Sequence, residues 1–200
     1  MLFKNNLLYL LKYTFMKKIT FFILYLFVLN ASAQESNKWL VGVGINFIDN
    51  TNSQDDNYFN VSNWNSTMSL SKITVQYNFI NDISLASEFT LNRLDKGKEH
   101  NGTTIGSNLS YFGWDLNGRY NVASLLNIQK KYSIEPILGV GFSWTGGTPN
   151  QSVNSGLSLG YFFNDYYGIR LQTQGKFAFE TDSTVGNNMI QHSLEFIIRL

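Results

Sequence analysis

The amino-acid sequence predicts an all-β chain whose eight antiparallel strands close into an up-and-down barrel. Three observations carry this prediction: long runs of alternating apolar and polar residues, clusters of Asn, Asp, Gly and Ser between the runs, and only two prolines. The runs exceed the ~5 or 6 residues of a typical soluble strand, and a tilted strand needs roughly 9 to 11 residues to cross a bilayer. We expect strands at 38–48, 66–79, 83–94, 108–121, 132–146, 153–163, 167–180 and 188–200.

The first 33 residues predict a secretory signal peptide. Lys17 and Lys18 precede an apolar run over residues 19–29, and Ala31-Ser32-Ala33 offers small residues for cleavage. The apolar run is much shorter than the ~20 residues of a membrane-spanning helix, although a retained pair of helices is the alternative. Met16 is a better start than Met1, because Met16 and the two lysines already form a complete positive head.

Cleavage after Ala33 would leave residues 34–200 as a single barrel domain. The removed segment holds four of the 15 basic residues and no acid, so the remaining domain carries 11 basic and 14 acidic residues. This balance gives no reason to expect a nucleic-acid partner. The chain has no cysteine, which excludes disulfides, a lipid anchor on cysteine and cysteine metal sites.

The two faces of the predicted strands require different surroundings. One face is apolar and aromatic, as in Leu138, Val140, Phe142 and Trp144, while the other is polar or small. A soluble, lipocalin-like barrel would place the apolar face inside, but an eight-stranded interior has room only for modest side chains. We therefore assign the small and polar face to the interior and the aromatic face to lipid, which makes the barrel a transmembrane one.

Eight charged residues fall on the face assigned to the lumen, and their charges sum to zero. We expect them to form a hydrogen-bonded network, because an unpaired buried charge costs several kcal/mol. Strand directions place four near mid-height and four nearer the periplasm: Lys72, Glu88, Asp115 and Lys176 in the first group, and Arg119, Glu135, Arg170 and Glu195 in the second.

Aromatic residues and turn lengths orient the barrel. Aromatic residues cluster at both ends of the predicted strands, as expected for rings at headgroup depth. The connections at 80–82 and 164–166 are tight, whereas those at 49–65 and 95–107 are long and polar. Short turns face the periplasm in such barrels and long loops face outward. Two connections fit less well, since the inner one at 122–131 is longer than the outer one at 146–152.

Several segments resemble the barrel half of OmpA-type outer-membrane proteins. The likeness covers residues 38–200 and rests on KWLVGVG at 38–44, NVSNWN at 60–65, EPILGVG at 135–141, LGYFFNDYYGIRLQ at 159–172 and QHSL at 191–194. The resemblance implies a location in the cell outer membrane, contact with its lipids, and insertion by the barrel assembly machinery, which reads an aromatic-rich final strand. Here the final strand keeps Phe196 but ends in Leu200. We expect no peptidoglycan-binding domain after the barrel.

Candidate chemistry outside the lumen is sparse. His192 and Ser193 suggest a lipid-modifying enzyme, but adjacent strand residues point to opposite faces. His100 is expected in an outer loop. Acidic and amide residues in the 49–57 segment could surround calcium, yet the segment lacks the Gly and closing Glu of a dedicated loop. Gly42 and Gly44 precede no helix and so form no phosphate loop. We therefore expect no catalytic, cofactor or metal residues.

The sequence favours an envelope protein that is structural or that interacts with its surroundings through its outer loops. A narrow, porin-like passive pore is the main alternative, and a lipid-modifying enzyme of the outer membrane is a weaker one. Nothing in the loops identifies a surface ligand.

The cleavage site gives a first test. Mass spectrometry of the protein extracted from membranes should show a chain that begins at Gln34, because Ala31 and Ala33 fit the small-residue requirement of signal peptidase. Detection of Leu2 or Lys17 in the extracted protein would contradict the prediction.

Overall fold

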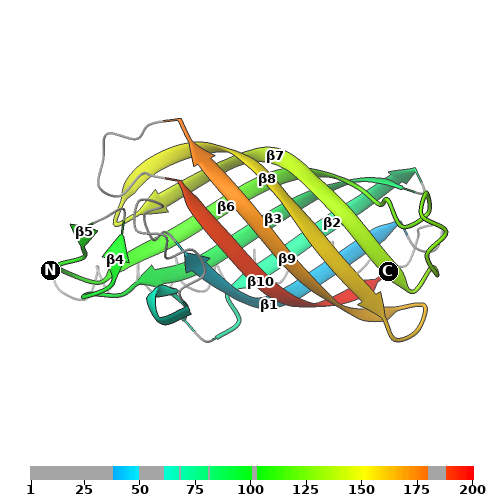
Figure 1. Ribbon diagram of the computed structural model, residues 1–200, viewed down its shortest axis with the longest axis horizontal. Helices are drawn as coiled ribbons and strands as arrows, with labels where there is room; N and C mark the ends of the chain where they lie inside the picture. The colour runs from blue at the N-terminus through cyan, green and yellow to red at the C-terminus, as the bar shows by residue number, and fades with distance from the viewer. Residues whose placement is uncertain (1–37, 50–60, 68, 81, 101–102, 180–187) are drawn as a thin grey trace, which may run out of the picture. The chain divides into compact units, whose positions relative to one another are not determined.

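A computed structural model describes residues 38–49, 61–67, 69–80, 82–100, 103–179 and 188–200. Eight long strands in these ranges form one closed antiparallel barrel, as predicted (Figure 1). They are β1 (Trp39–Asp49), β2 (Lys72–Ile80), β3 (Ile83–Leu94), β6 (Leu109–Tyr120), β7 (Tyr132–Thr145), β8 (Thr148–Phe162), β9 (Tyr167–Ala178) and β10 (Met189–Arg199). The predicted signal peptide lies outside the described residues.

Three shorter elements accompany the barrel. The strands β4 (Glu99–His100) and β5 (Thr103–Thr104) pair with each other, and a 3-10 helix spans Val61–Asn63. No helix in the described part of the chain is long and apolar enough to cross a membrane.

The barrel closes because the first and last strands pair. The β1–β10 ladder runs from Leu40 opposite Arg199 to Asp49 opposite Ile190, while β1 also pairs with β2 on its other side. Each of the eight strands therefore has two hydrogen-bonded neighbours. Such closure satisfies the backbone donors and acceptors, which lipid cannot do.

Burial alternates along the strands and separates the two faces. In β6, Asp115, Asn117 and Arg119 are buried, whereas Phe112, Trp114 and Leu116 at the alternate positions are exposed. The other long strands show the same alternation over most of their length. Polar and small side chains thus fill the interior, and aromatic and aliphatic side chains cover the outer wall.

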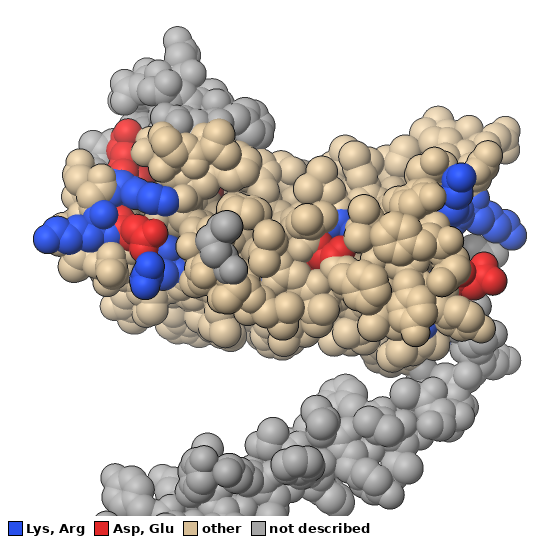
Figure 2. All heavy atoms as spheres, turned by 90° about the horizontal axis from the view of Figure 1, so that it is seen from below, with Lys and Arg blue, Asp and Glu red and all other residues tan. Residues whose placement is uncertain are grey.

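The outer wall carries an apolar belt. On the face that Figure 2 shows, charged residues gather mainly at the two ends, and the band between them is uncharged apart from one small spot of both signs. Leu138 in this band is 68% exposed, and Leu157, Leu171 and Leu194 are also exposed. A continuous apolar surface of this extent is unfavourable in water and matches the acyl chains of a bilayer.

Aromatic pairs mark both ends of the belt. Trp39 packs on Tyr77 at 4.8 Å and Tyr132 on Tyr161 at 5.3 Å, all near the end that holds the C-terminus. We call this the inner end; it also carries the β2–β3 and β8–β9 turns that the sequence analysis placed at the periplasm. Towards the opposite, outer end, the rings of Phe112 and Trp144 lie 5.5 Å apart on β6 and β7.

The β7–β8 connection is shorter than expected. The sequence suggested an outer loop at 146–152, but β8 begins at Thr148 and pairs with β7 up to the partners Thr145 and Thr148. Gly146 and Gly147 form the turn with φ values of 57° and 89°. Positive φ at both central residues fits a two-residue hairpin, and glycine adopts it without strain.

The strand β2 is also shorter than expected. It begins at Lys72, whereas the alternation predicted a strand from residue 66. The preceding Ser71 still bonds to both neighbouring strands, since its N–H donates to Gly44 O at 2.9 Å and its carbonyl oxygen accepts from Leu91 N at 2.8 Å. Asn46 Nδ2 also donates to the carbonyl oxygen of Ser71 at 3.1 Å and to its Oγ at 2.8 Å. Asn65 forms an isolated bridge with Ile48. The Asn46 amide thus adds side-chain hydrogen bonds to the backbone at the point where the regular β2 ladder begins.

The apolar belt predicts a dependence of stability on depth. Leu138→Arg, compared with Leu138→Ala, should cost about 2 to 4 kcal/mol in lipid because the position is mid-strand on the outer wall. Trp144→Arg, compared with Trp144→Ala, should cost only about 0 to 1 kcal/mol near the interface. Urea unfolding in liposomes measures both differences. Equal penalties, or a wild-type chain that folds as a monomer in buffer without lipid, would instead favour a soluble barrel.

Candidate functional site

The eight charged residues expected in the lumen all lie on the inner face of the barrel and are buried. Their exposed fractions range from 1% to 6%. They come from six strands: Lys72 on β2, Glu88 on β3, Asp115 and Arg119 on β6, Glu135 on β7, Arg170 and Lys176 on β9, and Glu195 on β10. Four are basic and four are acidic, so the group is neutral.

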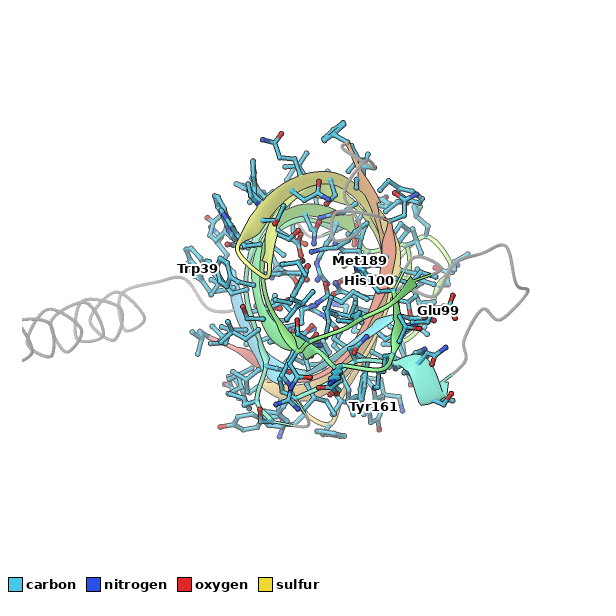
Figure 3. All side chains as sticks on the ribbon, turned by 90° about the vertical axis from the view of Figure 1, so that its left-hand side faces the viewer. Trp39, Glu99, His100, Tyr161 and Met189 are labelled. Atoms are coloured by element: carbon cyan, nitrogen blue, oxygen red, sulfur yellow. The ribbon has the colours of Figure 1, made fainter. Side chains whose placement is uncertain are left out.

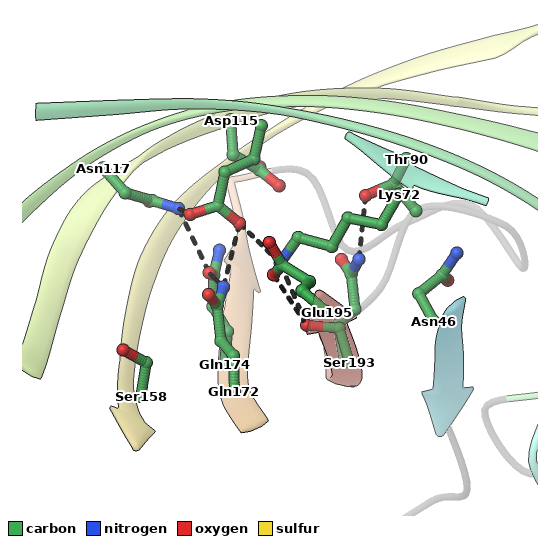
Figure 4. Close-up of polar contacts among 12 residues, drawn as sticks. Asn46, Lys72, Thr90, Asp115, Asn117, Ser158, Gln172, Gln174, Ser193 and Glu195 are labelled. Carbon is green, nitrogen blue, oxygen red and sulfur yellow. Dashed lines mark hydrogen bonds and ion pairs between the residues drawn. The ribbon is translucent and has the colours of Figure 1, made fainter. Parts of the chain in front are cut away.

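Glu88 joins several members of this group. One carboxylate oxygen lies 2.7 Å from Lys72 Nζ and the other 2.5 Å from Arg119 Nη2. The same carboxylate accepts hydrogen bonds from Asn117 at 2.8 Å and Gln172 at 2.9 Å (Figure 4). Two cations and two amide donors therefore surround one buried carboxylate, an arrangement that stabilises its ionised form.

Further ion pairs extend from Glu88 along the lumen. Lys72 Nζ lies 3.1 Å from Glu195, and Arg119 Nη1 lies 3.2 Å from Glu135. Glu135 is also 3.5 Å from Arg170. Ion pairs join the two predicted groups, because Glu88 contacts Arg119 and Lys72 contacts Glu195. Long basic side chains reach along the barrel axis and join the two groups.

Asp115 and Lys176 form a separate ion pair at 2.8 Å. Lys176 Nζ also donates to the Tyr111 hydroxyl at 3.1 Å, and Asn154 donates to Asp115 at 2.9 Å. Amide groups connect this pair to the larger network, since Asn117 Nδ2 donates to Gln174 and its Oδ1 accepts from Asn154. The polar contacts thus run continuously across the lumen.

Glycines on the inner wall make room for these side chains. A Cβ atom on Gly141 would lie 2.3 Å from Asp115 Oδ1. Gly44 in β1 is paired with Lys72 of β2 on one side and with Glu195 of β10 on the other. A Cβ atom on Gly44 would lie 2.1 Å from the carbonyl oxygen of Leu194, so this glycine lets the β10 backbone come close, while a Cβ atom on Gly42 would lie 2.4 Å from Glu195 Oε2. Lys72 and Glu195 meet across β1 at this point.

Apolar clusters lie beyond the charged network on both sides. At the outer end, the buried cluster consists of Ile48, Leu94, Ile105, Tyr111 and Met189. At the inner end it consists of Leu40, Phe162 and Ile197, with the Arg199 guanidinium 3.5 Å from the centre of the Phe162 ring. Viewed from the outer end, Met189 lies within the outline of the barrel (Figure 3). Sequence reasoning missed both clusters. Their strand residues are apolar side chains at positions where the alternation points inward.

The two histidines do not share a site. The His192 ring is on the outer face, stacked on Trp64 at 4.5 Å, with Nδ1 at 3.0 Å from Thr173 Oγ1. Its neighbour Ser193 faces the lumen and accepts a hydrogen bond from Lys72. This geometry separates the two groups that a lipid-modifying enzyme would need to combine. His100 lies in β4 and is buried.

No group of three or more His, Cys, Asp or Glu residues suited to a metal ion occurs in the described ranges. Of the loop considered for calcium, Asp49 ends β1, whereas residues 50–60 lie outside the described part of the chain.

A closed eight-stranded barrel with an apolar outer wall and a polar, packed interior has the architecture of an outer-membrane β-barrel of the OmpA-like type. Comparison with solved structures agrees at the level of the fold. The chain is similar to the N-terminal barrel domain of Pseudomonas aeruginosa OprF at 11% identity and a TM-score of 0.52, with 84% of this chain and all of that chain covered.

Two other solved structures are similar to a comparable degree. Escherichia coli outer membrane protein W has 10% identity and a TM-score of 0.51, with 84% of this chain and 100% of that chain covered. Neisserial surface protein A has 13% identity and a TM-score of 0.50, with coverage of 84% and 99%. No protein-family model matches the sequence, and no curated protein sequence does so. The predicted resemblance is thus confirmed in the fold.

The central position of Glu88 predicts a large loss of stability on neutralisation. Glu88→Gln should destabilise the folded barrel by about 3 to 5 kcal/mol, because it removes the shared counterion of Lys72 and Arg119 in a buried network. The matched control is Asp95→Asn, which removes the partner of the exposed Arg93 and should cost about 1 kcal/mol or less. Denaturant unfolding in lipid vesicles compares the two. Similar losses for both variants would show that the network adds no stability of its own.

Proposed function

We propose that the protein is an integral outer-membrane barrel whose lumen is a structural core rather than a channel, and whose outer loops make its contacts with the surroundings. The observation that carries this proposal is the filling of the lumen by a neutral charge network with apolar clusters at either end.

The arrangement of charges supports a non-conducting lumen. An ion that entered would have to compete with pairs such as Lys72 and Glu88 at 2.7 Å or Lys176 and Asp115 at 2.8 Å. Basic and acidic groups alternate, so neither sign of ion meets a path lined by the opposite charge alone. The apolar clusters would add a desolvation cost at both ends.

The outer end supports an interaction role. Trp64 Nε1 donates to Asp49 at 3.0 Å, and the Trp64 carbonyl oxygen accepts a hydrogen bond from Lys98. Asn65 Oδ1 accepts from the backbone N–H of Asp95 at 2.9 Å. Segments from two different outer connections are thus tied together above the barrel, which gives a partner a fixed surface to bind.

The belt and the last strand suggest the protein's other partners. Outer-membrane lipids would cover the apolar wall, and the barrel assembly machinery would insert the chain. The outward-facing Phe196 in β10, stacked on Tyr167, supplies an aromatic residue for recognition of the final strand.

Conductance in planar bilayers tests the proposal. The wild-type protein should give no stable ohmic current, because the ion pairs occupy the lumen. A variant with Arg119→Ala and Arg170→Ala should leak and prefer cations, since it removes two long side chains and leaves an excess of carboxylates. Leu138→Ala on the outer wall is the matched control and should stay silent. Circular dichroism of the same samples checks that each variant is folded.

A large and steady current through the wild-type protein would overturn the proposal in favour of the narrow pore. Hydrolysis or acyl transfer on outer-membrane lipids by the wild-type protein, lost in His192→Ala, would instead favour the enzyme.

A further inference from the structure

The connection between β6 and β7, residues 121–131, is the longest one at the inner end and has a fixed conformation. Leu126 N donates to the Val122 carbonyl at 3.2 Å, and Ile128 N donates to the Ala123 carbonyl at 2.9 Å. Asn121 Oδ1 accepts from Ala123 N at 3.1 Å, and Asn127 takes a φ of 53°. The turn stands out from the rim of the barrel (Figure 1).

This β6–β7 turn exposes two adjacent leucines. Leu125 is 68% exposed and Leu126 is 60% exposed, while Ala123 is buried beneath them. Lys130 and Lys131 follow on the same turn and are exposed. The turn contains no acidic residue, so it combines an apolar pair with a local positive charge; the acids Asp82 and Asp165 belong to other turns.

The turn continues directly into the aromatic residues that border the apolar belt at the inner end. Lys131 Nζ lies 5.2 Å from the centre of the Tyr132 ring and 5.9 Å from that of Tyr161. Tyrosine rings favour the depth of lipid headgroups, where a neighbouring lysine can contact phosphate while its stem covers apolar surface. The leucines therefore project from a turn that starts at the edge of the membrane.

We propose that the β6–β7 turn binds the adjacent membrane leaflet, with Leu125 and Leu126 inserted at the acyl-chain boundary and Lys130 and Lys131 on the phosphates of acidic phospholipids. The proposal rests on the proposed membrane location of the barrel. Apolar residues next to lysines are the combination that binds an anionic lipid surface. Continuity with the belt and the charge of the turn favour lipid over a protein as the occupant.

Fluorescent labelling tests this contact, since the chain has no natural cysteine to interfere. Single cysteines replace Leu126, Leu138 or Ser107 in the full-length protein, and each carries the polarity-sensitive dye NBD. Vesicles contain equal parts phosphatidylcholine and phosphatidylglycerol, and separate samples carry lipids brominated near the top or near the end of the acyl chain, so that both shallow and deep positions are reached. Quenching should be strong at the belt position Leu138, clear at Leu126 and weak at Ser107 in an outer loop.

A second variant tests the role of charge. Lys130→Gln with Lys131→Gln, in the chain labelled at position 126, should lower the quenching to the level found in vesicles of phosphatidylcholine alone. This variant leaves the barrel wall unchanged. If quenching at position 126 is the same with and without the two lysines, and with and without phosphatidylglycerol, the contact with acidic lipid is overturned.

The belt label separates failure of this inference from failure of the proposed function. If position 138 is quenched but position 126 behaves like position 107, the membrane barrel stands and the leaflet contact is wrong. A turn that binds a protein partner would give this result in vesicles that contain no other protein. If position 138 is not quenched, the membrane location and the leaflet contact fail together.

Discussion

Backbone hydrogen bonding is the constraint on which this structure depends. In a bilayer an unpaired N–H or C=O group costs several kcal/mol, so the strands need partners on both sides. Pairing of β1 with β10 meets this need and leaves none of the eight strands at an edge. Closure then forces alternate residues into two environments, lipid outside and a narrow lumen inside. The charge network follows, because ionised groups confined in that lumen have only each other and the amides as partners.

Much of the fold could be predicted because period-two alternation is a local property of the sequence. The number of strands, their direction and their two faces all follow from it, and the predicted boundaries mostly agree with the observed ones within a few residues. The inward position of Glu88 or Arg170 follows in the same way, since the phase of a strand fixes which residues share a face.

The remaining features depend on contacts between segments that are distant in sequence. Alternation continues through residue 66, yet Asn46 binds Ser71 and β2 starts only afterwards. The partner of each lumen charge depends on the reach of its side chain, which is why Arg119 contacts Glu88 on another strand. Met189 and Ile48 meet only once the barrel has closed, so the apolar clusters have no signature within any single strand.

The contact across β1 at Gly44 has a consequence for the order in which the barrel is completed. Lys72 meets Glu195 and Ser193 there, and the hydrogen bond from Lys72 to Ser193 spans 121 residues of sequence. Pairing of β1 with β10 must offset the entropic cost of closing so long a loop, because one polar contact is too weak to do so. Before that pairing we expect the lumen charges to keep their hydration shells. We therefore expect the interior of this barrel to lose its water last, after the wall is complete.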